Sequence, residues 1–274
     1  MDREEFISFI ESHKSTEGFD NLLLFTAMRR TGHHAILWYI LAAYKTKCLH
    51  VNMMIQSPGT FILCNNRMIL LGHPTPESRK INGTVEYNPF LSTFNPTEDA
   101  ISNHKVSIVS GNFENKPPSV VFQNWNFLSS YAENSNTCIS YFCILRNPIS
   151  QFASSTKLDG VEWPPSSNYI DSFLTLWHSY AEAFINETPL PEETLFILYD
   201  RWIVDSLYRR HILRRLNLEY TDEAFSWQSF HGNFSSFKVC NNRVEIEEKT
   251  KQYIPQSTLD LWEQCQNKDS TNFP

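Results

Sequence analysis

The sequence predicts an α/β fold in which a central parallel sheet is flanked by helices. The first observation is the apolar run at 22–25, which lacks polar alternation and is therefore typical of a parallel strand covered on both faces. The second is the helical spacing of apolar residues at 35–40, directly after that strand. The third is a second junction of strand and helix at 138–155. With 274 residues, 41% of them hydrophobic, the chain fits one large domain over 1–274.

The loop Arg29-Arg30-Thr31-Gly32 joins the first strand to its helix. A glycine lets backbone N–H groups gather around an anion, and a helix N-terminus supplies about half a positive charge. The two arginines add whole charges, so the sequence predicts a phosphate- or sulfate-binding strand, loop and helix. The common nucleotide loop G-x-x-x-x-G-K-[ST] needs two glycines and a lysine, which this segment lacks. The match to a kinase or an ATPase is therefore poor.

Composition excludes several classes of function. The 23 basic and 30 acidic residues give a formal charge of −7, which argues against a nucleic-acid partner. The six cysteines include no C-x-x-C pair and no zinc-like spacing, so we expect no metal and a reducing compartment. Cys138 and Cys143 are expected to be small buried residues. The chain shows no secretion signal and no apolar run of membrane-spanning length, which predicts a cytoplasmic protein without a transmembrane segment.

The first half of the chain is expected to begin with an amphipathic helix at 3–13, and the helix after the loop is expected to end near Lys47. Short apolar segments separated by turn residues then predict strands at 49–54, 60–64 and 67–71. Residues 72–105 are rich in Pro, Asn, Ser and Thr and show no sustained periodicity. A connection that long is usually functional or disordered. We therefore interpret it as an insertion on the acceptor side of the site, where a second substrate would bind.

The middle of the chain is expected to supply further strands at 106–110 and 119–125. The second of these ends in the polar residues 123–126, which become candidates for lining an acceptor pocket, because open α/β sheets bind ligands at the carboxyl ends of their strands. The apolar strand at 138–145 delivers Arg146, and Pro148 suits the first turn of the helix that follows.

The remaining elements are predicted from the same patterns. A helix at 168–186 carries one apolar stripe, and a strand follows at 194–199. The arginine-rich segment 200–216 is predicted to be one helix with a solvated basic face. A closing helix is expected at 256–265.

Three motifs carry a resemblance to a known family. The segment Arg30-Thr31-Gly32-His33-His34-Ala35 resembles the 5′-phosphosulfate loop of sulfotransferases that use 3′-phosphoadenylyl sulfate. Arg146 at a strand end and Ser154 eight positions later resemble the pair that binds the nucleotide 3′-phosphate in that family. The third feature resembles the family's closing glycine-serine loop and comprises Gly232, Ser235 and Ser236, preceded by Tyr199-Asp200-Arg201-Trp202. The motifs occur in family order, so the resemblance spans about 20–240.

The resemblance implies a P-loop-like sulfotransferase fold and a defined reaction. The sulfuryl group of 3′-phosphoadenylyl sulfate would move to a hydroxyl or amine of a carbohydrate, lipid or small molecule, leaving 3′-phosphoadenosine 5′-phosphate, with no metal. Residues 30–35 would hold the 5′ end of the cofactor, Arg146 and Ser154 would bind its 3′-phosphate, and the glycine-serine loop would close over the nucleotide. Arg30 and His33 are the expected catalytic residues. Arginine replaces the family's more common lysine and does not release a proton, so its role should be electrostatic.

Several alternatives stay open. His33 stands where hydroxyl residues are usual, and the acceptor base is undecided between four candidates: His33, His34, His104 and Glu114. Arg146 and Ser154 also fit a helix-capping arginine beside a surface serine. A divergent P-loop phosphotransferase would need Mg²⁺ and a carboxylate to hold it. A third class is a relative that binds nucleotide without turnover. The acceptor's identity and the oligomeric state do not follow from the sequence.

Overall fold

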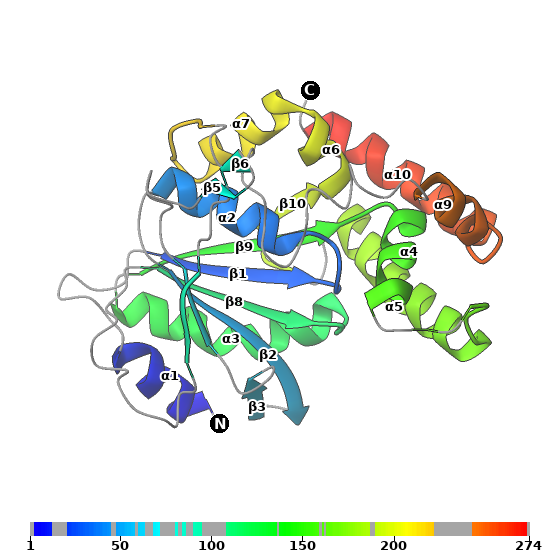
Figure 1. Cartoon of the computed structure of the whole chain (residues 1–274). Coiled ribbons are helices and arrows are strands. Elements are labelled where there is room, and N and C mark those ends of the chain that lie inside the picture. Colours follow the sequence, from blue (N-terminus) through cyan, green and yellow to red (C-terminus); the bar gives the residue numbers. More distant parts are fainter. Residues whose placement is uncertain are drawn as a thin grey trace.

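The computed structural model describes residues 3–12, 21–44, 48–57, 60–63, 68–71, 80–81, 84–85, 90–94, 108–135, 137–158, 161, 163–186, 190–221 and 243–272. Its main sheet has the strand order β10-β9-β1-β8-β2-β4-β7, with β3 paired to β2. Figure 1 labels β10, β9, β1, β8, β2 and β3 of this sheet. The strands of this sheet are β1 (Asn21–Ala27), β2 (Cys48–Ser57), β3 (Thr60–Leu63), β4 (Met68–Leu71), β7 (Phe90–Phe94), β8 (Ile108–Glu114), β9 (Cys138–Leu145) and β10 (Leu195–Leu198). A separate pair joins β5 (Lys80–Ile81) to β6 (Thr84–Val85).

The centre of the sheet is parallel. Parallel pairings join β10 to β9, β9 to β1, β1 to β8 and β8 to β2. The register aligns the ends of the three central strands, because Ala27 of β1 lies opposite both Glu114 of β8 and Ile144 of β9. Antiparallel strands β3, β4 and β7 extend the edge beyond β2. The predicted parallel sheet flanked by helices is confirmed, and the antiparallel edge is an addition to it.

Helices cover the two faces of the sheet (Figure 1). Alternate residues of β9 show the division, since Phe142 and Ile144 pack with α2 and α7, whereas Cys143 and Leu145 pack with α5. The helices of the first face are α2 (His33–Tyr44), α6 (Tyr199–Val204) and α7 (Ser206–Arg215). Those of the other side are α3 (Pro118–Ser135), α4 (Pro148–Leu158), α5 (Ser167–Asn186), α9 (Arg243–Lys251) and α10 (Gln256–Asn272). The first helix, α1, spans Arg3–Ser12.

The connections of two neighbouring strands diverge at the carboxyl edge of the sheet. The chain leaves β1 into α2 on one face and leaves β8 into α3 on the opposite face. Neighbouring strands whose connections diverge in this way leave open space beyond their carboxyl ends, where α/β proteins place their ligands. The Arg29-Arg30-Thr31-Gly32 loop lies at this position.

The strand predicted at 119–125 is wrong, because these residues belong to helix α3. A short apolar run fits a buried helix as well as a strand, and Pro118 stands at the first helical position, where proline is favoured. Gln123 is exposed on the helix, and the Asn124 side chain donates a hydrogen bond to the carbonyl of Val120 at 2.8 Å. These residues therefore do not stand at a strand end.

The single helix predicted at 200–216 is also wrong, because it divides at Asp205 into α6 and α7. The Asp205 carboxylate caps α7 by accepting hydrogen bonds from the backbone N–H groups of Leu207 and Tyr208 at 2.9 and 3.1 Å. The break leaves carbonyl groups of α6 to be satisfied, and the buried Arg209 side chain donates to those of Trp202 and Ile203. The solvated basic face is thus restricted to Arg210, Arg214 and Arg215.

Smaller differences concern the ends and edges of elements. Cys138 is exposed, contrary to expectation, while Cys143 is buried. The segment 72–105 contains three short strands, β5 to β7, within its described residues. The closing helix α10 is longer than predicted, and α9 was not predicted. The expected helix end near Lys47 lies outside the described residues.

Candidate anion-binding site

The loop between β1 and α2 adopts a strained conformation. Its residues Arg30 and Gly32 have positive φ angles of 65° and 91°, and only the glycine adopts such an angle without cost. The Thr31 side chain is buried and donates to the Met28 carbonyl at 2.9 Å, which closes the turn. The Gly32 carbonyl then accepts from the N–H groups of Ala35 and Ile36, which starts α2. A non-glycine residue held at positive φ costs of order 1–3 kcal/mol and typically marks a functional loop.

Arg30 lies against helix α4. Its Nε donates a hydrogen bond to the Oγ of Ser154 at 2.9 Å, across 124 positions of sequence. Within the part of the chain that the structure describes, Nε is the only side-chain nitrogen of Arg30 with a hydrogen bond. The terminal amino groups of the guanidinium are therefore available to an anion. The structure brings together Arg30 of the first motif and Ser154 of the second.

Arg146 connects the two strand ends. From the end of β9, its Nη1 donates to the carbonyl of Arg30 at 2.8 Å, and its Nε donates to the Oγ of Ser150 at 3.2 Å. Its guanidinium also lies over the ring of Tyr199, 5.1 Å from the centroid. Trp177 of α5 holds the backbone, because its Nε1 donates to the Arg146 carbonyl at 3.0 Å. Arg146 thus supports the strained loop and also brings a second positive charge to the site.

Two amide side chains hold the loop at Arg29. The backbone N–H of Arg29 donates to Oδ1 of Asn115 at 3.1 Å, and its carbonyl accepts from Nε2 of Gln151 at 3.1 Å. Asn115 follows β8, and Gln151 lies fully buried in α4. Polar residues after a strand end are the signal that points to Asn115, but the sequence-based strand stopped at 110 and this signal was missed. Nothing in the sequence alone points to Gln151.

The two histidines of the loop lie at the start of α2. His33 is 3% exposed, and its Nε2 lies 3.3 Å from the amide nitrogen of Asn112 on β8. His34 is half-buried, and the centroid of its ring lies 4.0 Å from the centroid of the His33 ring. The His34 ring also stacks on Trp38. The buried ring of His33 therefore lies beside the N-terminus of α2 and has a polar partner on β8. Like Asn115, Asn112 was not among the site residues predicted from the sequence.

The start of α4 adds a second helix N-terminus to the site. The Asn147 side chain accepts from the N–H groups of Ile149 and Ser150, and the Asn147 N–H donates to the Asp200 carboxylate at 2.7 Å. The first turns of α2 and α4 hold no acidic residue. Arg29, Arg30 and Arg146 and two helix ends therefore bring positive charge to one edge of the sheet, where the Asp200 carboxylate supplies one opposing charge.

Several predicted site residues cannot be placed in this arrangement. His104, Gly232, Ser235 and Ser236 lie outside the described residues. Glu114 is the last residue of β8, opposite Ala27. Ala35 is buried in the first turn of α2. The candidate anion-binding site consequently consists of residues 29–34, Arg146 and Ser154.

The three buried cysteines of the described ranges, Cys48, Cys143 and Cys265, are poor nucleophiles. Burial raises the pKa of Cys48 to about 12, and it likewise raises the pKa of Cys265 to about 12. Burial also raises the pKa of the Cys143 thiol. These groups stay protonated at neutral pH, so they pack as small apolar residues.

Within the described ranges, no cluster of three or more His, Cys, Asp or Glu side chains is arranged to hold a metal ion. Among the described helices, none is both long enough and apolar enough to span a bilayer. Comparison of the chain with protein-family models finds no match, and comparison with curated proteins finds no similar sequence.

Proposed function

We propose that the protein is a sulfotransferase that uses 3′-phosphoadenylyl sulfate. The acceptor oxygen or nitrogen attacks sulfur, and the bond between sulfur and the bridging 5′-phosphate oxygen breaks. The electron pair of that bond stays on the phosphate, and the acceptor's proton is released to solvent. Atoms and charge balance without a metal or a redox partner.

The chain's own residues take distinct roles in this reaction. The Arg30 side chain, the backbone N–H groups of Arg30 and Gly32, and the N-terminus of α2 stabilise the negative charge that grows on the leaving 5′-phosphate. Arg146 and Ser154 anchor the 3′-phosphate, since a guanidinium binds two phosphate oxygens and a hydroxyl donates to a third. His33 lies at the start of the same helix, and the resemblance assigns it to the catalytic residues.

The observation that carries the proposal is the contact between Arg30 and Ser154, together with the hydrogen bond from Arg146 to the Arg30 carbonyl. These residues come from two motifs more than one hundred positions apart, and the resemblance assigns both to one nucleotide. Their convergence at the carboxyl edge, beside two helix N-termini, provides adjacent sites for two anionic groups. A single free phosphate would need only one of them.

A reducing cytoplasm forms part of the proposal. The four cysteines within the described ranges, Cys48, Cys138, Cys143 and Cys265, are free. Free cysteines are typical of reducing compartments, where disulfides rarely persist.

The test compares nucleotides that differ in one phosphate. We expect 3′-phosphoadenosine 5′-phosphate to raise the melting temperature more than adenosine 5′-phosphate or ATP with Mg²⁺, at equal concentrations. Ligand at 100 times its dissociation constant adds about 2.7 kcal/mol of stability, which thermal unfolding detects easily. Equal shifts from the two adenosine phosphates would contradict a 3′-phosphate site. A shift that requires ATP and Mg²⁺ would favour the phosphotransferase, and binding without sulfuryl transfer would favour the non-catalytic relative.

A further inference from the structure

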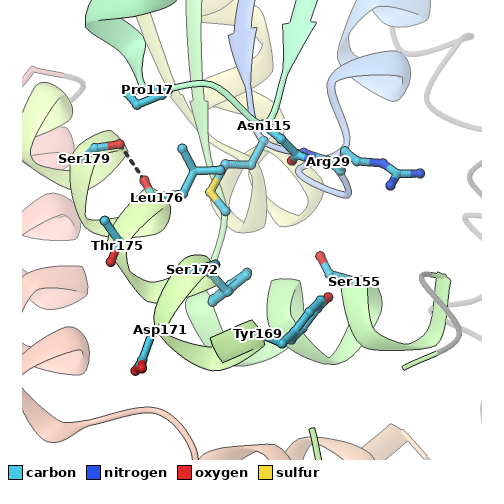
Figure 2. A pocket seen from close by; sticks show the side chains of 12 residues that line it. Arg29, Asn115, Pro117, Ser155, Tyr169, Asp171, Ser172, Thr175, Leu176 and Ser179 are labelled. Atoms are coloured by element: carbon cyan, nitrogen blue, oxygen red, sulfur yellow. Dashed lines mark hydrogen bonds between the residues drawn. The ribbon is translucent and has the colours of Figure 1, made fainter. Parts of the chain in front are cut away.

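A cavity of about 610 Å³ lies beside the anion-binding loop, between the end of β8 and helices α4 and α5 (Figure 2). Such a volume falls within the range of about 300–1,000 Å³ that is usual for sites of small molecules. Four residues supply its carbon walls: Met28, Pro117, Phe173 and Leu176. The cavity therefore has the size and the surface for an organic molecule.

The cavity shares a wall with the anion-binding site. Met28, which follows β1, and Arg29, the first residue of the loop, both line the cavity. Asn115 lines it as well and accepts the hydrogen bond from the Arg29 N–H, while Ser155 lines it next to Ser154. A molecule in the cavity would consequently lie next to whatever the loop binds.

The polar groups of the cavity suit a molecule without net charge. Several lining residues carry hydroxyl groups: Ser155, Tyr169, Ser172, Thr175 and Ser179. The Ser179 hydroxyl already donates to the carbonyl of Leu176 at 2.6 Å (Figure 2). The lining contains one basic and one acidic residue, Arg29 and Asp171, whose side chains extend to opposite sides of the view in Figure 2. One charge of each sign favours neither an anionic nor a cationic ligand.

We propose that this cavity holds the acceptor, and that the acceptor is a small, uncharged and mainly apolar alcohol. The inference rests on the proposed function and narrows it, because carbon walls favour an apolar body over a sugar or a charged amine. The acceptor's body lies against Phe173 and Leu176, and its hydroxyl faces the loop. This proposal places the acceptor beside α5, whereas the sequence predicted that residues 72–105 lie on the acceptor side.

The test measures binding of a chosen pair of alcohols by calorimetric titration. 2-Naphthalenemethanol and methyl β-D-glucoside both offer a primary hydroxyl, but only the first has an apolar body. Each is titrated into the full chain, with and without saturating 3′-phosphoadenosine 5′-phosphate. We expect the naphthyl alcohol to bind at least tenfold more tightly than the glucoside. Equal affinities, or tighter binding of the glucoside, would overturn the assignment of acceptor class.

Two cavity-filling variants test whether the naphthyl alcohol binds in the cavity. Thr175 is an exposed residue of α5 that lines the cavity, so Thr175→Trp fills the space without replacing a buried side chain. Ser172→Trp is the second variant of this kind, and circular dichroism confirms that each one is folded. Glu182→Trp is the control, because Glu182 is exposed on the same helix and does not line the cavity. We expect both filled variants to lose at least tenfold in affinity for the naphthyl alcohol, and the control to match the parent.

The outcomes separate this inference from the proposed function. If the filled variants bind the alcohol like the parent while 3′-phosphoadenosine 5′-phosphate still binds preferentially, the cavity assignment is wrong and the proposed function stands. If the alcohol binds in the cavity but the nucleotide shows no preference for the 3′-phosphate, the role as a sulfuryl acceptor is overturned together with the proposed function.

Discussion

The ring of Tyr199 lies directly against Gly32, so a Cβ atom at position 32 would be only 2.0 Å from Cε2 of that ring. Gly32 belongs to the loop after β1, whereas Tyr199 begins α6 after β10. The same ring lies beneath the Arg146 guanidinium and stacks on Trp202. The close approach of loop and ring therefore explains why the loop has a glycine at this point, in addition to its φ of 91°.

Replacement of Gly32 by alanine is expected to destabilise the fold. The positive φ alone costs about 1–3 kcal/mol for a residue with a Cβ, and the clash with Tyr199 adds to this cost. Urea denaturation of Gly32→Ala measures the sum. The same substitution in a Tyr199→Ala background retains the backbone cost but removes the clash, so its cost should be smaller. An equal cost in both backgrounds would show that the ring yields freely.

Arg146→Ala should weaken binding of 3′-phosphoadenosine 5′-phosphate by about 1.5–3 kcal/mol, which is the size of a hydrogen bond to a charged group. Calorimetric titration measures this change. Ser154→Ala should cost only about 0.5–1.5 kcal/mol, because its hydroxyl is neutral. Ser150→Ala is the control. Ser150 lies in α4 and accepts a hydrogen bond from Nε of Arg146, but it has no assigned role at the nucleotide. If Arg146→Ala binds the nucleotide like the parent, Arg146 is a residue that caps α4 and supports the loop.

Arg30→Ala should act mainly on turnover. Negative charge grows on the 5′-phosphate as the bond to sulfur breaks, so the Arg30 interaction strengthens in the transition state and its loss lowers kcat. Preorganised donors of this kind contribute about 2.7–4 kcal/mol, which corresponds to a loss of roughly one hundred- to one thousandfold. Single-turnover transfer of labelled sulfate from the donor to water measures the effect without requiring an acceptor.

The matched variant at this position is Arg30→Lys. A lysine ammonium still neutralises one phosphate oxygen, so this variant should recover much of the lost rate. If Arg30→Ala turns over like the parent while its affinity for the donor collapses, Arg30 is a binding residue and the catalytic role is wrong.

Asp205 is expected to stabilise the fold in a manner that depends on pH. Hydrogen bonds from the N–H groups of Tyr208 and Leu207 and the neighbouring Arg201 hold the pKa of this carboxyl below its usual value of 3.8. A carboxyl with a lowered pKa in the folded state contributes stability above the unfolded pKa, and this contribution is lost as pH falls through the folded value. At pH 7, Asp205→Ala should therefore cost about 1 kcal/mol, as is typical for an N-cap.

Urea denaturation across pH 2.5 to 7 tests this prediction. The difference between parent and Asp205→Ala should be constant above about pH 5 and should shrink below it, as the pH falls through the unfolded and then the folded pKa. Burial raises the pKa of the nearby Asp269, and the charge of Asp205 adds to that rise, so part of the difference between parent and variant at low pH comes from Asp269. A difference that grows as the pH falls would contradict the role of the ionised Asp205.

The sequence alone determined the two junctions of strand and helix on which the site is built. The apolar run at 22–25, the single glycine at 32 and the proline at 148 are local signals, because burial on both faces, positive φ and a missing N–H act within a few residues. The parallel sheet follows from the same alternation of strands and helices. Residues 119–125 were misassigned because a short apolar run has no periodicity that separates a buried helix from a strand.

Only the tertiary structure decided which polar groups meet. Contacts of Arg30 with Ser154 and of Arg29 with Asn115 and Gln151 depend on the register of β1 against β8 and β9. Arg209 was expected in solvent but lies buried. The break at Asp205 leaves carbonyl groups at the end of α6, and the Arg209 side chain donates hydrogen bonds to two of them. The cavity beside the loop likewise has walls from β8, α4 and α5. Sequence periodicity reports which face of an element is buried, whereas the partner on that face is set by the packing of elements distant in the chain.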